Sequence, residues 1–414
     1  MGTFILILEK TPMTSHSNDQ TAVMKSLFLL SVLLIYPLPQ IAIDIYLPSW
    51  PAMVSALHTS RELLQWSLTI YVLFLGMAQL IYGPLSDRFG RKPVLLFGIG
   101  VFFISSFMGM FVVSMGQLLV LRAIQGLSIG CGFTVASAIL ADVFQGNQLA
   151  KVTSYSAMIY SISLMFAPFI GGYLQHYIGW QANFGGMALY ALILFLLIYL
   201  FVFETKDKQK KAIFSISSIL KNYFLLFHNL VFIGAIFCLI LAYGVMITFN
   251  IVGPFLLQET LHVSVIGYGQ LLLLIGVAYF IGATVNSFFV KYAGIHRLII
   301  LGLILMFCSS LGLVAIVILH VVTVTNIVAL VGLTIFSVGF IYPNCFAYAL
   351  DVFHEKGYAS ALIGSAILIG VSIISAIVSH FNIDHEYCLS FAFLILSILS
   401  ILSYVLTRII IKKR

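Results

Sequence analysis

Long apolar segments follow one another along almost the whole chain, with short polar breaks between them. Most reach about 20 residues, the length that an α-helix needs to cross the hydrocarbon core of a bilayer. Twelve such segments can be marked, at about 26–57, 63–84, 94–113, 118–141, 153–174, 182–203, 223–256, 264–290, 298–318, 326–350, 359–380 and 388–408. Charged residues make up only 8% of the sequence, too few to coat a protein dissolved in water. The sequence therefore predicts an all-α integral membrane protein with twelve transmembrane helices.

Weak internal repeats indicate that the two sets of six segments are related. The longest charged break, Glu204 to Phe214, separates the sets. The sequence AILADVF at Ala138–Phe144 is matched by AYALDVF at Ala347–Phe353, at corresponding segment ends. Likewise, GRKPVLLFG at Gly90–Gly98 has a weaker counterpart, GIHRLIILG, at Gly294–Gly302. Membrane folds built from repeats place a site between the related halves, so we expect two pseudo-symmetric six-helix bundles.

Basic residues gather in alternate breaks between the segments. They are Arg88, Arg91 and Lys92; Lys151; Lys206, Lys208, Lys210, Lys211 and Lys221; Lys291 and Arg297; Lys356; and Arg408, Lys412, Lys413 and Arg414. The intervening breaks carry almost none, with Arg61 the exception. Because positive loops stay in the cytoplasm, both termini and the central loop are predicted to be cytoplasmic. We attribute the net charge of +7 to basic residues that set this topology, and we do not expect nucleic-acid binding.

This topology defines the expected domains. We expect a disordered tail, a first bundle, a central loop, a second bundle and a short second tail, over 1–25, 26–203, 204–222, 223–408 and 409–414. The five cysteines lie far apart and form no C-x-x-C pair. They are predicted to be packing residues, with no disulfide, metal site or cofactor.

Two ionisable residues fall inside the predicted spans, Asp44 in the first and Arg122 in the fourth. A charge at membrane depth costs about 2.5–3.5 kcal/mol on the insertion scale. Such residues therefore tend to face the interior, find partners and mark a route for ions or substrate. Four prolines surround Asp44, namely Pro37, Pro39, Pro48 and Pro51. Carbonyls freed by proline need partners or a water-filled cavity, which favours a cavity-lining helix; a kinked scaffold helix with buried structural pairs is the alternative.

Helical spacing adds candidates for a pocket. Tyr36, Gln40 and Asp44 are four residues apart and lie on one helix face. An aromatic ring, an amide and a carboxylate on one face suit a water-accessible pocket better than a lipid-facing surface. Gln125 shares a face with Arg122 in the fourth span. Three further candidates lie in the second half, each with a purely structural role as its alternative: Tyr243, Asn250 and Asn344.

Asp44 and Arg122 are also candidates for proton coupling. Burial disfavours the charged form of a carboxylate, whereas a nearby guanidinium favours it. A carboxylate balanced between these two effects can take up and release a proton. We therefore expect Asp44 to be protonated from outside when substrate leaves and to lose its proton inward when substrate binds.

The stretch GPLSDRFGRKP, Gly83 to Pro93, packs four charged residues between two apolar segments. Such a cluster cannot lie in hydrocarbon and must form a short cytoplasmic turn. The stretch resembles the loop between helices two and three of the major facilitator superfamily, whose pattern is G-x-L-x-D-R-x-G-R-K. The resemblance implies a secondary transporter with two six-helix bundles around a central cavity, working by alternating access.

The same resemblance implies a gate at the inner face. In the family, the loop aspartate engages the loop arginine and a helix N-terminus, and an acidic residue at the inner end of helix four completes the cluster. The matching and adjoining residues here are Gly83, Asp87, Arg88, Gly90, Arg91 and Asp142. We expect the cluster to join the halves in the outward-open state and to break on inward opening. Charges that only set topology are the alternative.

Two further stretches indicate a branch of the family. DIYLPSWPAM at Asp44–Met53 and APFIGGYL at Ala167–Leu174 are similar to the Bcr/CflA branch of the twelve-span drug:proton antiporters. The second stretch implies a hinge motif on helix five, made of Pro168, Gly171 and Gly172. The motif departs from the antiporter pattern, since Ser154, Ser163 and Ala167 hold positions usually occupied by glycine.

The sequence thus predicts a proton-coupled transporter that exports small amphipathic compounds or drugs. We expect a monomer in the lipids of a bacterial inner membrane, driven by the proton gradient and needing no cofactor. A carrier for one natural metabolite or siderophore, in either direction, is the alternative. A channel or a membrane enzyme is disfavoured, because the sequence offers no selectivity-filter loop, metal cluster or nucleophile–base arrangement.

Overall fold

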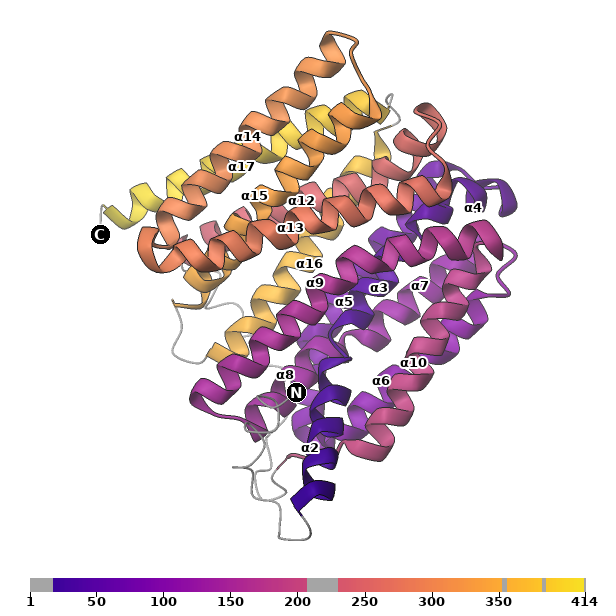
Figure 1. Ribbon diagram of the computed structural model, residues 1–414, viewed down its shortest axis with the longest axis vertical. Helices are drawn as coiled ribbons and strands as arrows, with labels where there is room; N and C mark the ends of the chain where they lie inside the picture. The colour runs from indigo at the N-terminus through magenta and orange to yellow at the C-terminus, as the bar shows by residue number, and fades with distance from the viewer. Residues whose placement is uncertain (1–17, 207–229, 352–355, 382–384, 413–414) are drawn as a thin grey trace.

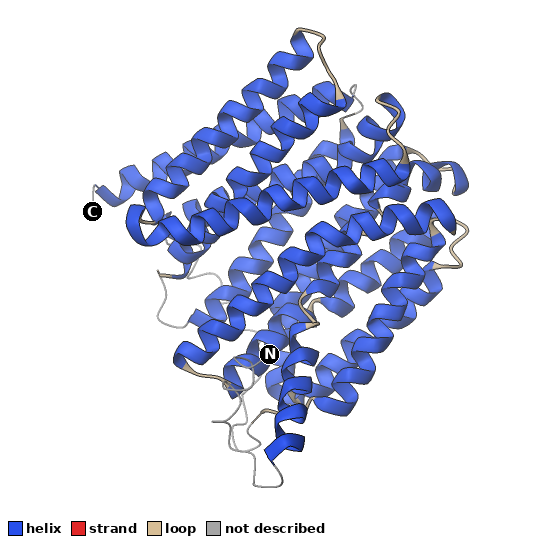
Figure 2. Ribbon diagram, viewed as in Figure 1, coloured by secondary structure: helices blue, strands red, loops and turns tan. Residues whose placement is uncertain are grey.

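The computed structural model describes residues 18–206, 230–351, 356–381 and 385–412. All regular structure in these ranges is helical (Figure 2). The segment expected to be disordered, 1–25, is helical from Asn18 onward, and its first 17 residues lie outside the described ranges. Of the expected central loop, only residues 204–206 are described.

The helices fall into two consecutive groups. The first group comprises α2 (Asn18–Leu33), α3 (Pro37–Asp44), η1 (Leu47–Ser49), α4 (Trp50–Ala56), α5 (Arg61–Phe89), α6 (Arg91–Gly109), α7 (Met115–Ile129), α8 (Cys131–Val143), α9 (Gly146–Tyr177) and α10 (Gln181–Phe201). The second group comprises α12 (Leu230–Phe255), η2 (Leu256–Thr260), α13 (Val265–Ala293), α14 (Ile295–Ile318), α15 (Val324–Leu350), α16 (Lys356–His380) and α17 (His385–Lys412). In Figure 1 the indigo-to-magenta helices lie on one side and the orange-to-yellow helices on the other.

Twelve helical stretches among the described residues are long and apolar enough to cross a membrane, which confirms the predicted all-α membrane fold. Three of these spans are built from more than one element. The first runs through α2, α3, η1 and α4, the fourth through α7 and α8, and the seventh through α12 and η2.

Prolines break the first span. Pro37 opens α3, Pro48 lies in η1, and Pro51 lies in the first turn of α4. Proline is tolerated at the start of a helix, where its missing N–H is not needed. The chain therefore restarts at successive prolines, and α3 ends at Asp44, partway along the span.

The two halves meet along two helix pairs, α9 with α13 and α5 with α16. In Figure 1, α9 and α13 run side by side at this boundary. A Cβ atom added to Gly172 would lie 2.9 Å from the carbonyl oxygen of Val265, and one added to Gly276 would lie 2.9 Å from the side chain of Met165. Glycines thus let the backbones of the two halves approach closely.

The turns opposite the Gly83–Pro93 loop repeat a local conformation. His58 and His262 both have positive φ, 47° and 53°. Two residues later, Ser60 and Ser264 cap α5 and α13 by accepting a hydrogen bond from the third helical N–H. Positive φ is uncommon outside glycine, so its recurrence at corresponding turns supports the internal duplication. We call the helix ends on this side the outer ends.

Candidate functional site

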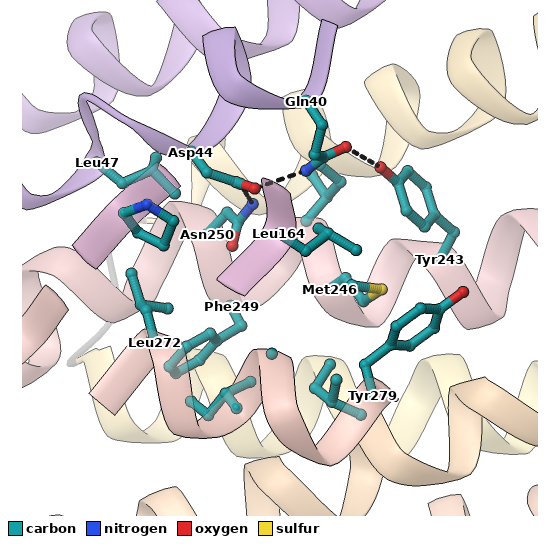
Figure 3. Close-up of a pocket in the computed structure, with 15 residues that line it drawn as sticks. Gln40, Asp44, Leu47, Leu164, Tyr243, Met246, Phe249, Asn250, Leu272 and Tyr279 are labelled. Carbon is teal, nitrogen blue, oxygen red and sulfur yellow. Dashed lines mark hydrogen bonds between the residues drawn. The ribbon is translucent and has the colours of Figure 1, made fainter. Parts of the chain in front are cut away.

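A pocket lies between the two halves (Figure 3). Residues of α3, η1 and α9 line one side, and residues of α12, α13 and α15 line the other. The lining residues are Gln40, Asp44, Leu47, Leu164, Pro168, Tyr243, Met246, Ile247, Phe249, Asn250, Leu272, Ile275, Gly276, Tyr279 and Ile335. The surface is mostly apolar, with a few polar groups that converge on Asp44.

Asp44 lies at the end of α3 with 4% of its surface exposed. Its Oδ2 accepts a hydrogen bond of 2.8 Å from Nε2 of Gln40 on the same helix. Its Oδ1 accepts one of 3.2 Å from Nδ2 of Asn250, which belongs to α12 in the other half. Two amide donors, one from each half, therefore satisfy the two carboxylate oxygens (Figure 3).

Gln40 connects Asp44 to two tyrosines. Its Oε1 accepts hydrogen bonds from the hydroxyls of Tyr160 on α9, at 2.7 Å, and Tyr243 on α12, at 3.4 Å. The carboxylate, the amide and the hydroxyls form one network across the pocket. Because each hydrogen bond depends on its neighbours, such a network responds as a unit to a change in protonation.

Arg122 is fully buried behind α3 and forms no ion pair with Asp44, although both residues are described. Its Nη1 donates to the carbonyl oxygen of Ala42 at 3.1 Å and to Oε1 of Gln125 at 3.0 Å. Its guanidinium carbon lies 3.7 Å from the ring centroid of Tyr46. The carbonyls in the last turn of α3 lack partners within the helix, and a cation is favourable at a helix C-terminus. The expected direct effect of Arg122 on Asp44 is therefore replaced by a contact with the helix that carries Asp44.

Four of the candidate pocket residues line the pocket, namely Gln40, Asp44, Tyr243 and Asn250. The other three point elsewhere. Tyr36 bonds Ser137 at 3.0 Å, Gln125 bonds Ser106 at 3.0 Å, and Asn344 bonds Asn286 at 2.6 Å. Each of these contacts stays within one half, so the structure gives all three a packing role in place of the expected lining role.

Two helices that the sequence did not indicate as pocket walls, α9 and α13, contribute to the pocket. Tyr160, Leu164 and Pro168 follow one another at intervals of four on α9, with Tyr160 joining the network and the other two lining the pocket. On α13, the lining residues Leu272, Ile275, Gly276 and Tyr279 are spaced as one helix face. This spacing was visible in the sequence, but apolar faces with the same spacing occur on lipid-exposed helices as well.

The glycines of the predicted helix-five motif, which lies on α9, are at close contacts between helices. A Cβ atom at Gly171 would overlap the carbonyl oxygen of Ile45 in the first span. Gly172 faces α13 in the other half, and Pro168 lines the pocket. The motif thus holds α9 against both the first span and the second half.

The loop cluster expected at the inner face is formed. Arg91 pairs with Asp87 at 2.6 Å and with Asp142 at 3.2 Å. Glu204, which lies outside the predicted cluster, also belongs to it. Its carboxylate accepts hydrogen bonds from the backbone N–H groups of Arg91 at 2.9 Å and Lys92 at 3.2 Å. A carboxylate at the N-terminus of α6 is favoured by the helix dipole.

This cluster lies entirely within the first half. Among the described residues, its ionic contacts join α5, α6 and α8, and none crosses to the second half. Arg88 lies over the ring of Phe89 instead, and Gly83 faces Thr134. In this structure the described partners of Arg91 all come from its own bundle. The expectation that the cluster joins the halves in the outward-open state stays a prediction.

Among the described residues, the contacts between acidic and basic side chains that cross between the halves lie at the outer ends. Arg61 pairs with Glu259, and Glu62 lies 3.5 Å from Nδ1 of His380. Arg61 also lies over the ring of Phe255. The structure therefore has its two halves joined at the outer ends while the loop cluster at the opposite ends is complete.

The described residues contain no group of three or more His, Cys, Asp or Glu side chains placed to hold a metal ion. The five cysteines are free thiols. The sulfurs of Cys238 and Cys345 lie 3.8 Å apart, both buried between helices of the second half.

Known proteins resemble this chain in sequence and in fold. A sequence model of the Major Facilitator Superfamily matches residues 32–375. The bicyclomycin resistance protein homolog of Haemophilus influenzae is 27% identical over 382 residues, which cover 91% of this chain and 95% of that protein. Multidrug resistance protein MdtL of Escherichia coli is 29% identical over 358 residues, covering 83% and 85%. The crystal structure of a D-xylose-proton symporter superposes with a TM-score of 0.73 over 90% of this chain and 96% of that chain, at 16% identity, and shows likeness of fold.

Proposed function

The chain belongs to the Major Facilitator Superfamily, as the Gly83–Pro93 loop predicted, and on that premise we propose that this transporter exports small amphipathic compounds in exchange for protons. The observation that carries the proposal is Asp44, a carboxylate in a pocket between two halves, bonded to residues of both. Similarity to a bicyclomycin resistance homolog and to MdtL agrees with the Bcr/CflA branch and supports export of drug-like compounds.

In the proposed cycle, Asp44 carries the proton. When the pocket opens to the outside, protonation of Asp44 removes a negative charge and weakens its hold on a bound compound. When the pocket opens inward, the proton leaves to the cytoplasm and the carboxylate again accepts hydrogen bonds. A shift between the two states requires only that proton and substrate bind them with different affinities.

The lining of the pocket supports an amphipathic substrate. Leucine, isoleucine, methionine and phenylalanine side chains supply apolar surface, as at Met246 and Phe249. Amide and phenol groups supply a few orienting contacts, as at Gln40, Asn250 and Tyr279. Pockets that combine apolar walls with a small number of polar groups are typical of small-molecule sites.

We also propose the orientation of the protein in its membrane. The alternation of basic residues supports cytoplasmic termini and a cytoplasmic loop cluster, with the outer ends facing away from the cytoplasm. We assign the protein to a bacterial inner membrane, where a proton gradient is available, as a monomer that uses no cofactor.

A second candidate, a carrier for one polar natural compound such as a metabolite or siderophore, is favoured by one observation. The network of Gln40, Tyr160 and Tyr243 offers several hydrogen-bonding groups, more than an unselective apolar site needs. A thermal-shift screen against drugs, metabolites and metallophores separates the two candidates, since the second predicts stabilisation by a single compound class.

Replacement of Asp44 tests the proton coupling. In proteoliposomes with a pH gradient, Asp44→Asn should reduce gradient-driven movement of bicyclomycin, or of the best compound from the screen, to background, because the amide cannot carry a proton. Glu386→Gln, on α17 and outside the pocket lining, is the matched control and should keep wild-type rates. Full gradient-driven transport by Asp44→Asn would overturn the assignment.

A further inference from the structure

We infer that Asn250 is a positioning residue through which the protonation state of Asp44 controls closure of the outer side. The inference rests on the proposed function, because it takes Asp44 as the proton carrier. It assigns to Asn250, in the second half, the task of sensing that proton. The hydrogen bond from Nδ2 of Asn250 to Oδ1 of Asp44 is the contact that carries it.

Three hydrogen bonds join the first span to the seventh, with acceptors four residues apart on the first span and donors seven or eight residues apart on the seventh. From the outer end inward, Gln258 donates to the carbonyl oxygen of Pro48 at 3.1 Å, Asn250 donates to Asp44 at 3.2 Å, and Tyr243 donates to Gln40 at 3.4 Å. Each connects one half to the other. We call this set the ladder.

Only the middle bond of the ladder has an acceptor whose hydrogen-bonding capacity changes with protonation. A backbone carbonyl and a glutamine oxygen accept hydrogen bonds at any ordinary pH. A carboxylate accepts at both oxygens, whereas a carboxylic acid donates from one of them. Both oxygens of Asp44 face amide donors, one on Gln40 and one on Asn250.

Protonation of Asp44 therefore creates a conflict between two donors. Gln40 is held in its orientation by Tyr160, whose hydroxyl donates to Oε1 at 2.7 Å. Asn250 makes no other side-chain hydrogen bond within the described part of the chain. It is therefore the amide that must give way or rotate to accept from the carboxylic acid, and a bond between neutral groups is weaker than one to a carboxylate. Loss of the charge-assisted bond weakens the ladder at its middle and favours separation of the outer ends.

Asp44 is the group near the ladder whose charge changes with pH, because the groups around it keep theirs. The phenols that lie within electrostatic range of it come from α5, α12 and α13, at Tyr71, Tyr243 and Tyr268. Tyr160 on α9 reaches it through Gln40. The guanidinium of Arg122, on α7, is bound to α3 at Ala42 and remains a fixed cation. Phenols stay neutral at physiological pH, so the pH response of the ladder belongs to Asp44.

The test measures the separation of the outer ends as a function of pH. Spin labels at Ser55→Cys and Thr260→Cys, both exposed on opposite halves, report this distance in the full chain in lipid nanodiscs. Cys308→Ser and Cys388→Ser remove the two cysteines that are not fully buried. In the otherwise wild-type protein, the population with separated outer ends should rise as pH falls.

Asn250→Ala should reduce this pH-dependent change in the population ratio by about tenfold, the effect of one hydrogen bond to a charged group. Gln258→Ala is the matched control, because it removes a neighbouring bond of the ladder whose acceptor cannot be protonated. It should favour separation by about two- to tenfold at every pH, the effect of one neutral hydrogen bond, and leave the pH dependence unchanged.

A second variant, Asn250→Asp, should reverse the direction of the pH response. In Asn250→Asp, two carboxylates would face each other and could share one proton. Closure should then be favoured as pH falls and lost as pH rises, the reverse of the wild type. A merely structural role for Asn250 would not reverse the profile.

The outcomes separate this inference from the proposed function. If Asp44→Asn keeps the wild-type pH response, Asp44 is not the titrating group and the proposed function fails together with the inference. If Asp44→Asn abolishes the response while Asn250→Ala retains it in full, Asp44 stands and the role of Asn250 is overturned. Loss in Asn250→Ala with reversal in Asn250→Asp supports the inference.

Discussion

At the scale of single residues, Gly90 shows how tightly the loop cluster is built. It links α5 to α6 with φ 99° and ψ 155°, a conformation that is essentially confined to glycine. A Cβ atom here would also lie 2.5 Å from Oε2 of Glu204. Its counterpart in the second half, Gly294, has φ 77° and ψ 158° but nothing within 4 Å of such a Cβ.

Alanine substitutions at these two glycines should lower stability by different amounts. Gly294→Ala should lower the free energy of unfolding by about 1–3 kcal/mol through backbone strain alone. Gly90→Ala should lower it further, because the methyl group displaces the carboxylate that caps α6. Thermal unfolding of purified variants measures both. The double variant Gly90→Ala with Glu204→Ala should show less than the sum of the single effects; equal losses for the two glycines would contradict this account.

The sequence located Asp44 but not its partners. A carboxylate in an apolar segment stands out because of its cost in lipid, and that is a local property. Which amide reaches it is not local, since Asn250 follows 206 residues later. Arg122 was expected to act on Asp44 directly, whereas the geometry turns its guanidinium toward the carbonyl of Ala42.

At the scale of elements, α9 is packed through glycines on two sides. Gly171 meets the backbone of the first span at Ile45, and Gly172 meets α13 at Val265. Pro168, three residues before Gly171 on the same helix, lines the pocket. The helix thus connects the span that carries Asp44 with the opposite half.

Substitution of these glycines should act mainly by disturbing the packing between helices, and less by changing helix propensity. Gly171→Ala should destabilise the protein by about 1–3 kcal/mol, because the added methyl group overlaps the Ile45 carbonyl and forces the helices apart. Gly100→Ala on α6 is the control, since its Cβ would meet the ring of Phe195 at an ordinary 3.5 Å. Melting temperatures in detergent compare the two, and a Gly171→Ala protein as stable as the control would refute the packing role.

At the scale of the whole molecule, the outer ends are joined by charges as well as by the ladder. Arg61 and Glu259 pair across the halves with 50% and 29% of their side chains exposed. Solvent screens such a pair, so its contribution is small, about 0–1 kcal/mol. A small contribution is suited to a contact that must break in every transport cycle.

Reversing the charge of Glu259 should shift the balance between conformations modestly, and swapping both charges of the pair should undo that shift. Glu259→Arg should increase the population with separated outer ends, by up to about fivefold from the lost pair and further from repulsion between two arginines. The swapped protein, Arg61→Glu with Glu259→Arg, should return toward the wild-type population. Spin-label distances at the outer ends provide the measurement, and a swap that fails to restore closure would show that packing, not charge, governs this contact.

The sequence by itself determined the spans, their division into two sets, the family, the carboxylate in the membrane and three charged members of the loop cluster, Asp87, Arg91 and Asp142. These follow from transfer free energies and charge placement, which each segment expresses on its own. The tertiary structure alone decided which helix faces line the pocket, which partner Arg122 takes and that Asn250 meets Asp44. In a bilayer, lipid is as apolar as the protein interior, so hydrophobic periodicity does not distinguish a face turned to lipid from one turned to a neighbouring helix.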